Sequence, residues 1–490
     1  MSRCYNVIGS GFSGLSAAAF LAKSGKKVNV IEKNQEFGGR ARQFSSNGFL
    51  FDMGPSWYWM PDVFDKFFSN FQKTTSDYYK LKKLDPGFQI IFDQKHTMKL
   101  HSDWSSVLTL FEEYEKGAAD NLIKFMKDAE IKYNVGMKHL VYNPGTSLSE
   151  LFNKDIWLNI GKMNLFRSYR NHVYKYFKNP FLRKLLEFPV LFLGTSPSDT
   201  PALYSLMAYS GISQGTYYPM GGFGEVIKGM ISLCRSLGVN FYNNNEVTSF
   251  SFNGKKIDQI ITSNSVFKTD EVICSADYNH FDQNILPKKY RNYSHKYWDK
   301  RVMSPSSLLF YLGVDVKLKN LEHHNLFFDE DIECHIKEIY KDIKWPTDPL
   351  FYVCCPSKTD PKAAPKGKEN LFLLMPLAAG LKDSQDLREM YFKKIISRLE
   401  KYCEIDLSNK ICFKKSYCID DFKSDYYAFK GNAYGLANTL FQTANLKPKI
   451  KNRYVSNLFY TGQLTVPGPG VPPAIISGNV VADYILKQKY

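Results

Sequence analysis

The sequence predicts an α/β fold in which a Rossmann-like dinucleotide-binding domain is assembled from discontinuous segments and joined to an α+β domain. Three observations predict it. The chain opens with a short apolar strand, a glycine-rich turn and a helix of small residues. Its 490 residues exceed one typical core, so two domains are expected. Residues 461–478, close to the C-terminus, hold four prolines, four glycines and no charge, which indicates a shaped backbone and not a fraying end.

The composition limits the class of protein. Hydrophobic residues make up 44% and charged residues 23%, as in a folded globular chain. Nine scattered cysteines without a CxxC pair, and an N-terminus that runs directly into a strand, indicate reduced thiols in a cytoplasmic protein. The histidines show no ligand spacing, so no metal site is predicted. No apolar run reaches the ~18 residues that span a bilayer. The net charge of +16 suits an anionic partner: nucleic acid, an acidic substrate or a phospholipid surface.

The first element is a nucleotide-binding unit. Residues 4–9 are predicted to form a buried strand, residues 12–25 a helix, and residues 26–33 the next strand. Gly9, Gly11 and Gly14 between the first strand and the helix have the GxGxxG spacing. Gly9 permits the tight turn, Gly11 lets a pyrophosphate approach the backbone, and Gly14 lets the helix pack closely on the strand. The helix N-terminus then presents free N–H groups to the phosphates.

An acidic residue at the end of the second strand completes this unit. Glu32 lies 23 residues after Gly9, where its carboxylate can accept hydrogen bonds from ribose hydroxyls, and Lys33 follows it. The alternative is a glycine-rich turn in an ordinary βαβ unit. Because strand, helix and acid agree, the dinucleotide site is preferred.

The next segment distinguishes FAD from NAD. "GGRAR", residues 38–42, resembles the extended fingerprint of the FAD-binding amine-oxidase-like superfamily. That resemblance implies that the backbone at Gly39 and the guanidinium of Arg40 meet the FAD diphosphate. A surface arginine in a salt bridge is the alternative for Arg40.

Residues 48–61 are predicted to form a strand that leads into a loop. In the superfamily this segment, which contains Gly54 and Pro55 here, lies near the flavin ring. The aromatic run 57–59 either faces an apolar substrate or belongs to the core.

Further pieces of the FAD domain follow. Residues 218–239 predict a glycine-led amphipathic helix, residues 240–264 strands joined by a turn at Asn253-Gly254, and "DEVICSAD" another strand. The resemblance places the adenine contact at about Val247. We therefore assign 1–60, 218–285 and 431–490 to the FAD-binding domain.

The remaining segments, 61–217 and 286–430, are assigned to a substrate-binding and membrane-associating domain. Helices are expected at 105–140 and 385–404, and strands at "SSLLFYLGV" and "NLFLLMPL". Residues 162–186 hold seven Lys or Arg, six aromatic residues and no acid. Three interpretations compete: an interfacial membrane element, a nucleic-acid surface, and a solvated basic face over a core helix. Nucleic acid is disfavoured because no RNA- or DNA-binding motif accompanies the segment.

Five motifs together identify a narrower resemblance. "VIGSGFSGLSAAAFLAKSG" with "GGRAR", "FDMGPSWYWMP", "GNAYGLANTLFQTA" and "LFYTGQLTVPGPGVPPAIISG" resemble the bacterial-type phytoene desaturases, FAD-dependent carotenoid desaturases, along the whole chain. The resemblance implies stepwise desaturation of 15-cis-phytoene toward lycopene in carotenoid biosynthesis. It implies hydride transfer to flavin N5 with loss of a proton from the neighbouring carbon, FAD as the redox cofactor, and oxygen or a quinone as electron acceptor. It also implies peripheral attachment to the cell membrane, which holds the lipid-dissolved substrate.

The Gly/Pro-rich stretch takes its role from the same resemblance. Gly462 lets the backbone pass the FAD diphosphate and ribityl chain, and Val471 and Pro472 begin a helix whose N–H groups would face the flavin.

Several alternatives stay open. They are a C30 diapophytoene desaturase, a desaturase of hydroxylated carotenoids, a carotenoid isomerase, an amine or protoporphyrinogen oxidase, and a non-enzymatic carrier of FAD or carotenoid. No catalytic acid or base is assigned. Asp52 lies near the presumed flavin segment, but capping the turn before Gly54-Pro55 is the preferred role for it.

Overall fold

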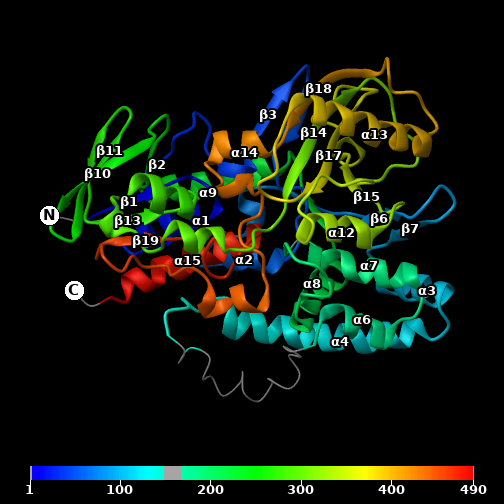
Figure 1. The fold of residues 1–490 in the computed structure, drawn as a ribbon, viewed down its shortest axis with the longest axis horizontal. Coiled ribbons are helices and arrows are strands. Elements are labelled where there is room, and N and C mark those ends of the chain that lie inside the picture. The colour runs from blue at the N-terminus through cyan, green and yellow to red at the C-terminus, as the bar shows by residue number, and fades with distance from the viewer. Residues whose placement is uncertain (1–2, 148–149, 151–166, 192, 489–490) are drawn as a thin grey trace.

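The computed structural model describes residues 3–147, 150, 167–191 and 193–488. Figure 1 shows two lobes side by side, one of which carries both chain termini. That lobe is built around a parallel sheet, and the other around a larger mixed sheet with a layer of helices beneath it.

The first lobe contains a five-stranded sheet in the order β19-β13-β1-β2-β9, with all neighbouring strands parallel. Its strands come from all three segments assigned to the FAD domain, so the discontinuous Rossmann-like fold is confirmed, while the segment boundaries stay a prediction. The bounds are β1 Cys4–Ile8, β2 Lys27–Ile31, β9 Asn240–Tyr242, β13 Glu271–Cys274 and β19 Leu458–Tyr460.

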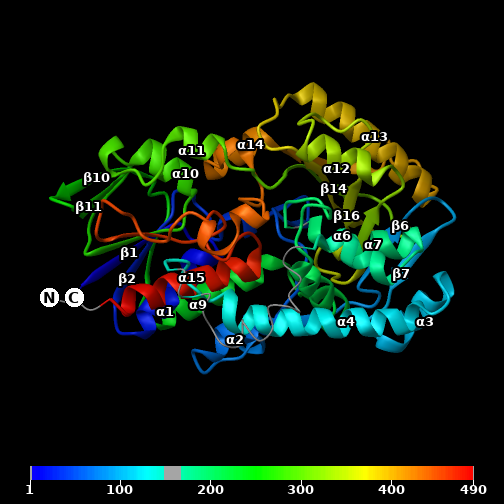
Figure 2. The same ribbon diagram turned by 60° about the horizontal axis from the view of Figure 1, so that its bottom comes forward.

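Three helices pack against this sheet: α1 Phe12–Lys23, α9 Phe223–Ser236 and α15 Val471–Leu486. Helix α1 is buried along almost its whole length, and α15 lies beside it (Figure 2). A side chain at Gly478 would place its Cβ 2.3 Å from the Ser13 carbonyl oxygen, so the two helix backbones touch there. The predicted turn after Asn253 joins β10 Val247–Asn253 to β11 Lys256–Thr262, and β12 Val266–Lys268 completes this small sheet.

The second lobe contains a seven-stranded sheet in the order β18-β14-β17-β16-β15-β6-β7. Strand β14, Ser306–Val314, is buried at all nine positions, as its unbroken apolar sequence predicts. Leu308 and Phe310 face the core under α13, whereas Leu309 and Tyr311 face the first lobe. The other strands are β6 Phe88–Ile91, β7 Thr97–Leu100, β15 His324–Phe327, β16 Phe351–Cys354, β17 Glu369–Leu377 and β18 Ile411–Tyr417.

Helices cover this second sheet. Helix α13, Gln385–Cys403, forms as predicted, but the helix expected at 105–140 divides into α3 Trp104–Tyr114 and α4 Ala118–Val135. Gly117, with φ of 82°, separates them in a conformation that a helix does not allow. Among the described residues, the other α-helices and short strands are α2 Pro61–Ser69, α6 Tyr169–Tyr176, α7 Pro180–Leu191, α8 Leu206–Ala208, α10 Tyr278–His280, α11 His295–Asp299, α12 Ile332–Tyr340, α14 Ile419–Tyr426, β3 Gln43–Ser46, β4 Phe49–Asp52, β5 Leu81–Lys83 and β8 Tyr217–Pro219.

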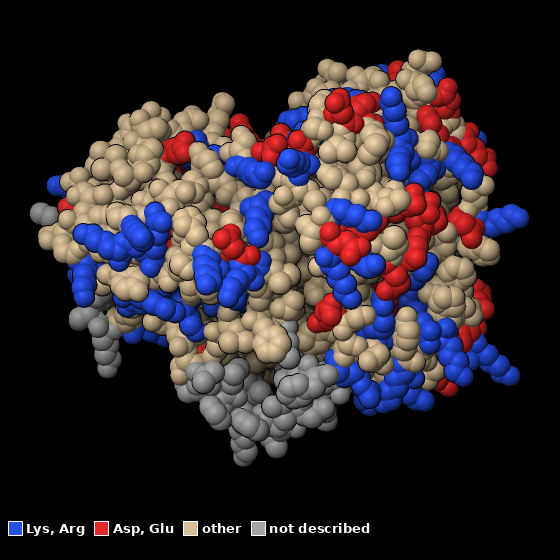
Figure 3. Space-filling view, viewed as in Figure 1, with Lys and Arg blue, Asp and Glu red and all other residues tan. Residues whose placement is uncertain are grey.

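The basic aromatic segment 162–186 is described from residue 167 onward, and its first five residues lie outside the described part of the chain. The rings of Tyr169 and Phe177 are fully buried against the helices around them. Arg170 forms an ion pair with Glu187, with 3.0 Å between Nε and Oε1. Figure 3 shows Lys and Arg gathered over the end of the molecule that α3, α4 and α6 form. The described part therefore combines a buried aromatic face with a basic outer face.

Candidate active site

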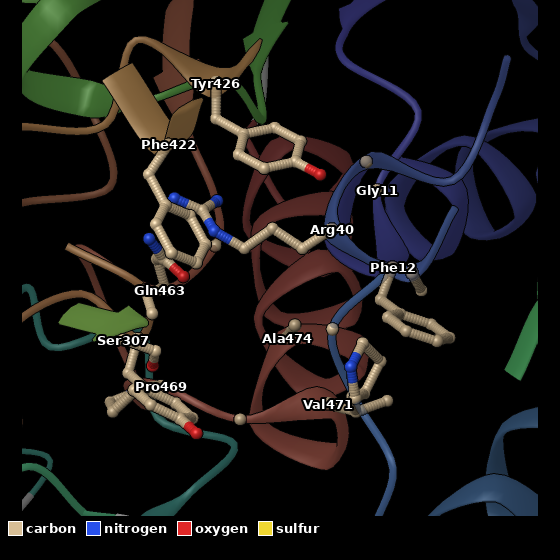
Figure 4. Close-up of a pocket in the computed structure, with 18 of the residues that line it drawn as sticks. Gly11, Phe12, Arg40, Ser307, Phe422, Tyr426, Gln463, Pro469, Val471 and Ala474 are labelled. Carbon is tan, nitrogen blue, oxygen red and sulfur yellow. The ribbon is translucent and has the colours of Figure 1, made fainter. Parts of the chain in front are cut away.

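A cavity of about 490 Å³ lies where the two lobes meet and takes residues from both of them. Its polar end is lined by the glycine turn after β1 and by the N-terminus of α15, and Figure 4 shows this end. Its other end is lined by β14, β15, β17 and α12. One continuous space therefore joins the predicted nucleotide site to the second lobe.

The three glycines of the turn have different surroundings. A side chain at Gly14 would place its Cβ 2.1 Å from the Gly9 carbonyl oxygen, and Gly14 does not line the cavity, so it serves helix–strand packing. Gly9 lines the cavity with φ of +98°. Gly11 also lines it, has φ of −71°, and would place a Cβ in open space with no atom within 4 Å. The turn thus leaves room for a ligand at Gly11.

The acidic residue after β2 is held in place by its own neighbours. The Glu32 carboxylate accepts hydrogen bonds from Ser10 N (3.0 Å) and Ser10 Oγ (2.6 Å) on one oxygen, and from Asn34 N (3.0 Å) on the other. A ribose hydroxyl at this position would join or replace the Ser10 hydroxyl. Lys33 also lines the cavity, with Nζ 3.8 Å from the centre of the Tyr427 ring, and burial lowers its pKa.

The buried guanidinium of Arg40 is the strongest sign of an anionic ligand. Its Nε and Nη2 atoms have no hydrogen-bond partner among the residues that the structure describes. Burial lowers its pKa, and the side chain crosses the cavity toward the Tyr426 ring, 4.9 Å away (Figure 4). The neighbouring Gly39, with φ of +57°, lies against the glycine turn, since a Cβ on it would be 3.2 Å from Gly11 Cα. A guanidinium with two buried nitrogens that have no described partner, next to open space at a helix N-terminus, fits a diphosphate.

The Gly/Pro-rich stretch closes the polar end. Gly462 has φ of +108° and donates from N to Ser477 Oγ at 2.9 Å. Val471 and Pro472 line the cavity as the first two residues of α15. Proline at 472 and 473 carries no N–H, and the amide of Ala474 donates to Gly470 O at 3.0 Å. The amides of Gly470 and Val471 are therefore the ones that this helix start can offer, and their contact with the flavin stays a prediction.

The other predicted residues divide between lining and support. Val247, Gly54 and Pro55 line the cavity, and a side chain at Gly54 would place its Cβ 2.6 Å from the Arg40 carbonyl oxygen. Asp52 does not line it. Its carboxylate accepts from Phe223 N at 3.0 Å, so it caps α9 and not the turn before Gly54-Pro55, which corrects that prediction. Burial raises the pKa of Asp52 to about 6.

The aromatic run splits between the two interpretations. Trp57 and Trp59 line the cavity, whereas Tyr58 is fully buried and stacks on Phe64 with ring centroids 4.1 Å apart. This follows from the period of an extended chain, in which alternate side chains point the same way.

The end of the cavity lined by β14, β15, β17 and α12 forms a second compartment, which is apolar. Leu309, Leu326, Phe328, Ile336, Phe372 and Leu374 are among the residues that line it. Their sequence pattern does not mark them as site residues, because an apolar strand residue that faces a cavity has the same pattern as one that faces the core.

His335 is the histidine of this second compartment. Its Nδ1 accepts from Leu350 N at 2.8 Å and its Nε2 donates to Pro376 O at 3.2 Å. Burial lowers its pKa to about 4, so the ring is neutral with both nitrogens engaged.

Comparison with known proteins identifies the family. Residues 12–486 match the family described as flavin containing amine oxidoreductase. The chain belongs to this family. Its cofactor is FAD, which the unpaired Arg40, the open space at Gly11 and the positive end of α15 fit.

Within the flavin-containing amine oxidoreductases, two curated relatives match over nearly the whole chain. The carotenoid 3,4-desaturase of Haloarcula japonica is 38% identical over 484 residues, 98% of each chain. The 4,4'-diapophytoene desaturase (4,4'-diaponeurosporene-forming) of Staphylococcus aureus is 30% identical over 497 residues, again 98% of each.

Solved structures share the family fold at low identity. A putrescine oxidase bound to putrescine has a TM-score of 0.63 at 14% identity, with 100% of both chains covered. An oxidoreductase from Methanosarcina mazei has a TM-score of 0.62 at 16% identity, covering 99% of this chain and 100% of that one. These likenesses concern the fold.

Proposed function

We propose that this flavoprotein is an FAD-dependent carotenoid desaturase. The observation that carries the proposal is the apolar compartment that continues from the FAD site. The carboxylates that line the cavity, Glu32, Glu246, Asp277 and Asp425, belong to segments around Arg40 and the nucleotide turn. An amine oxidase acting on a cationic substrate would gain from a carboxylate in the substrate compartment. A hydrocarbon polyene needs only apolar burial.

The FAD, when bound, supplies the hydride acceptor for a CH–CH bond. The protein's own part is positioning and exclusion of water. Trp57 and Trp59 line the cavity together with Leu309 and Leu374, which are register partners on β14 and β17, and these side chains form apolar walls for a polyene. His335 is neutral and hydrogen-bonded at both nitrogens, so it supports the wall and does not act as a base in this arrangement. Orientation of the substrate is then the main catalytic device.

The favoured substrate is a carotenoid of the kinds that the names of the two relatives give. The relative with 38% identity is named a carotenoid 3,4-desaturase, and the one with 30% a diapophytoene desaturase. Stepwise conversion of 15-cis-phytoene toward lycopene is the alternative within the same chemistry.

Attachment to a membrane surface belongs to the same proposal, because such substrates dissolve only in lipid. Within the described residues no helix is long and apolar enough to cross a membrane. The basic face near α3, α4 and α6 suits the phosphates of a bilayer surface. Reoxidation by oxygen or a quinone completes the proposed cycle.

The test uses hosts that accumulate one carotenoid each: 15-cis-phytoene, 4,4'-diapophytoene or a hydroxylated carotenoid. Coexpression should lengthen the conjugated system of one of them, which absorbance and mass of the extracted pigments will show. Unchanged pigments in every host, with purified protein that still holds FAD, would refute the proposal.

A further inference from the structure

Three buried side chains with metal-binding atoms meet behind the wall of the cavity. One ring nitrogen each of His323 and His324 and the Sγ of Cys354 lie within 4.8 Å of one another. Their exposed fractions are 3%, 0% and 2%. His324 and Cys354 are register partners across β15 and β16, so their side chains project from the same face of the sheet. Sequence spacing did not predict this cluster, because pairing of two strands brings it together.

Hydrogen bonds orient both imidazoles in the manner of metal ligands. Tyr352 donates its hydroxyl proton to Ser56 Oγ at 3.1 Å, so its oxygen accepts from His324 Nδ1 at 2.6 Å. His323 Nδ1 lies 2.7 Å from Thr359 Oγ1. In the described part of the chain the Nε2 atoms of both rings are buried without a partner. A histidine that donates from one nitrogen presents a lone pair on the other, which is the usual arrangement around a bound metal.

The net charge of the metal-loaded cluster favours a monovalent metal ion over a divalent one. The three side chains are almost completely shielded from water, so a net charge left on the metal-loaded cluster would be costly. A thiolate with a monovalent ion makes a neutral site, whereas a divalent ion leaves a buried positive charge. The charged side chains that act on the cluster, Lys82 on His323 and Asp52 on Cys354, have opposite signs.

We propose that His323, His324 and Cys354 form a buried three-coordinate site for monovalent copper. Thiolate and imidazole are the ligand types that Cu(I) prefers. Metal–ligand bonds of about 2.0–2.3 Å require ligand atoms roughly 3.5–4 Å apart, so small side-chain rotations close the cluster. The proposed site takes no part in the desaturation reaction. A bound metal would link β15 to β16 behind Trp57, whose ring stacks on the His324 ring with centroids 4.1 Å apart.

The experiment measures copper in the tag-free, FAD-loaded protein after anaerobic titration with Cu(I) against a competing chelator. The exposed Cys334 and Cys412 are changed to serine first, because they would bind copper on their own. About one copper per chain is expected in this background. Cys354→Ser should lose it, whereas Cys355→Ser, a neighbouring buried thiol on the opposite face, should keep it.

A spectroscopic readout keeps the test independent of how well one variant folds. X-ray absorption of the copper-loaded protein should show one sulfur and two imidazole nitrogens, and His324→Gln should lose a nitrogen ligand. Equal copper in the Cys354 and Cys355 variants, no copper in the background protein, or tighter retention of Zn²⁺ than of Cu(I) would each overturn the proposal.

Discussion

The substitution Gly11→Ala should weaken FAD binding while it leaves the stability of the apoprotein nearly unchanged. With φ of −71° the backbone accepts alanine, and the new methyl meets no protein atom within 4 Å. Gly11 is the N-cap of α1, where alanine in place of glycine costs below about 1 kcal/mol. Reduced freedom of the unfolded chain offsets about 0.4–1 kcal/mol of that. The free energy of unfolding of the apoprotein should therefore change little.

The cofactor should respond strongly to the same methyl group. It enters the space through which a diphosphate approaches the helix N-terminus, and moving the diphosphate removes at least one charge-assisted hydrogen bond. Such a bond contributes about 1.5–3 kcal/mol. At ~1.4 kcal/mol for each factor of ten, the Kd for FAD should rise roughly 10- to 150-fold.

The measurements are FAD titration by flavin fluorescence and thermal unfolding of the apoprotein. Gly14→Ala is the contrasting variant, because its methyl would lie 2.1 Å from the Gly9 carbonyl oxygen and should destabilise the apoprotein itself. Wild-type FAD affinity in Gly11→Ala would refute the placement of the diphosphate. A large loss of apoprotein stability in Gly11→Ala would refute the statement that a methyl group there meets no protein atom.

Three further variants test other parts of the site. Arg40→Met should raise the FAD Kd about 10- to 150-fold without destabilising the apoprotein, since it removes a cation whose buried nitrogens have no described partner. Arg42→Met is the control, because Arg42 does not line the cavity and its guanidinium forms a 2.7 Å pair with Asp425; it should destabilise the apoprotein more than it weakens FAD binding, and matching effects of the two variants would contradict this. Asp52→Asn should keep desaturation. Burial raises the pKa of Asp52 in the folded protein to about 6, so the folded state still binds a proton at pH values where the unfolded chain has lost it. The free energy of unfolding of the wild-type apoprotein should therefore fall as the pH rises from about 4 to 6. The fall should be smaller in Asp52→Asn, which denaturant unfolding at the two pH values will show. Gly462→Val, at φ of +108°, should cost about 1–3 kcal/mol of stability and lose the bound flavin, and a fully yellow variant would count against it.

The nucleotide end was predictable because it depends on local rules. Strand, glycine turn, helix and acid follow one another in the chain, so Gly9, Gly11 and Glu32 take their places from spacing alone. Arg40 came from the resemblance, and its unpaired, buried state is what the structure adds.

The residues of the second compartment were not predictable, because they depend on which face of the second lobe's sheet packs against the first lobe. Nothing in "SSLLFYLGV" distinguishes Leu309, which lines the cavity, from Leu308, which faces α13. The capping of helix α9 by Asp52 was also not predictable, since the amide of Phe223 that Asp52 accepts from lies 171 residues away in the sequence. Contacts between distant segments carry no local pattern.

The order of synthesis gives the contact between α1 and α15 a further meaning. Strand β1 and helix α1 leave the ribosome long before β19 and α15, which lie within residues 458–486. Until these are made, α1 lacks the helix that covers it and the cavity lacks the wall at Val471. Flavin capture therefore requires the segment from β19 to α15, and chains cut short before residue 458 should emerge colourless and open to proteolysis.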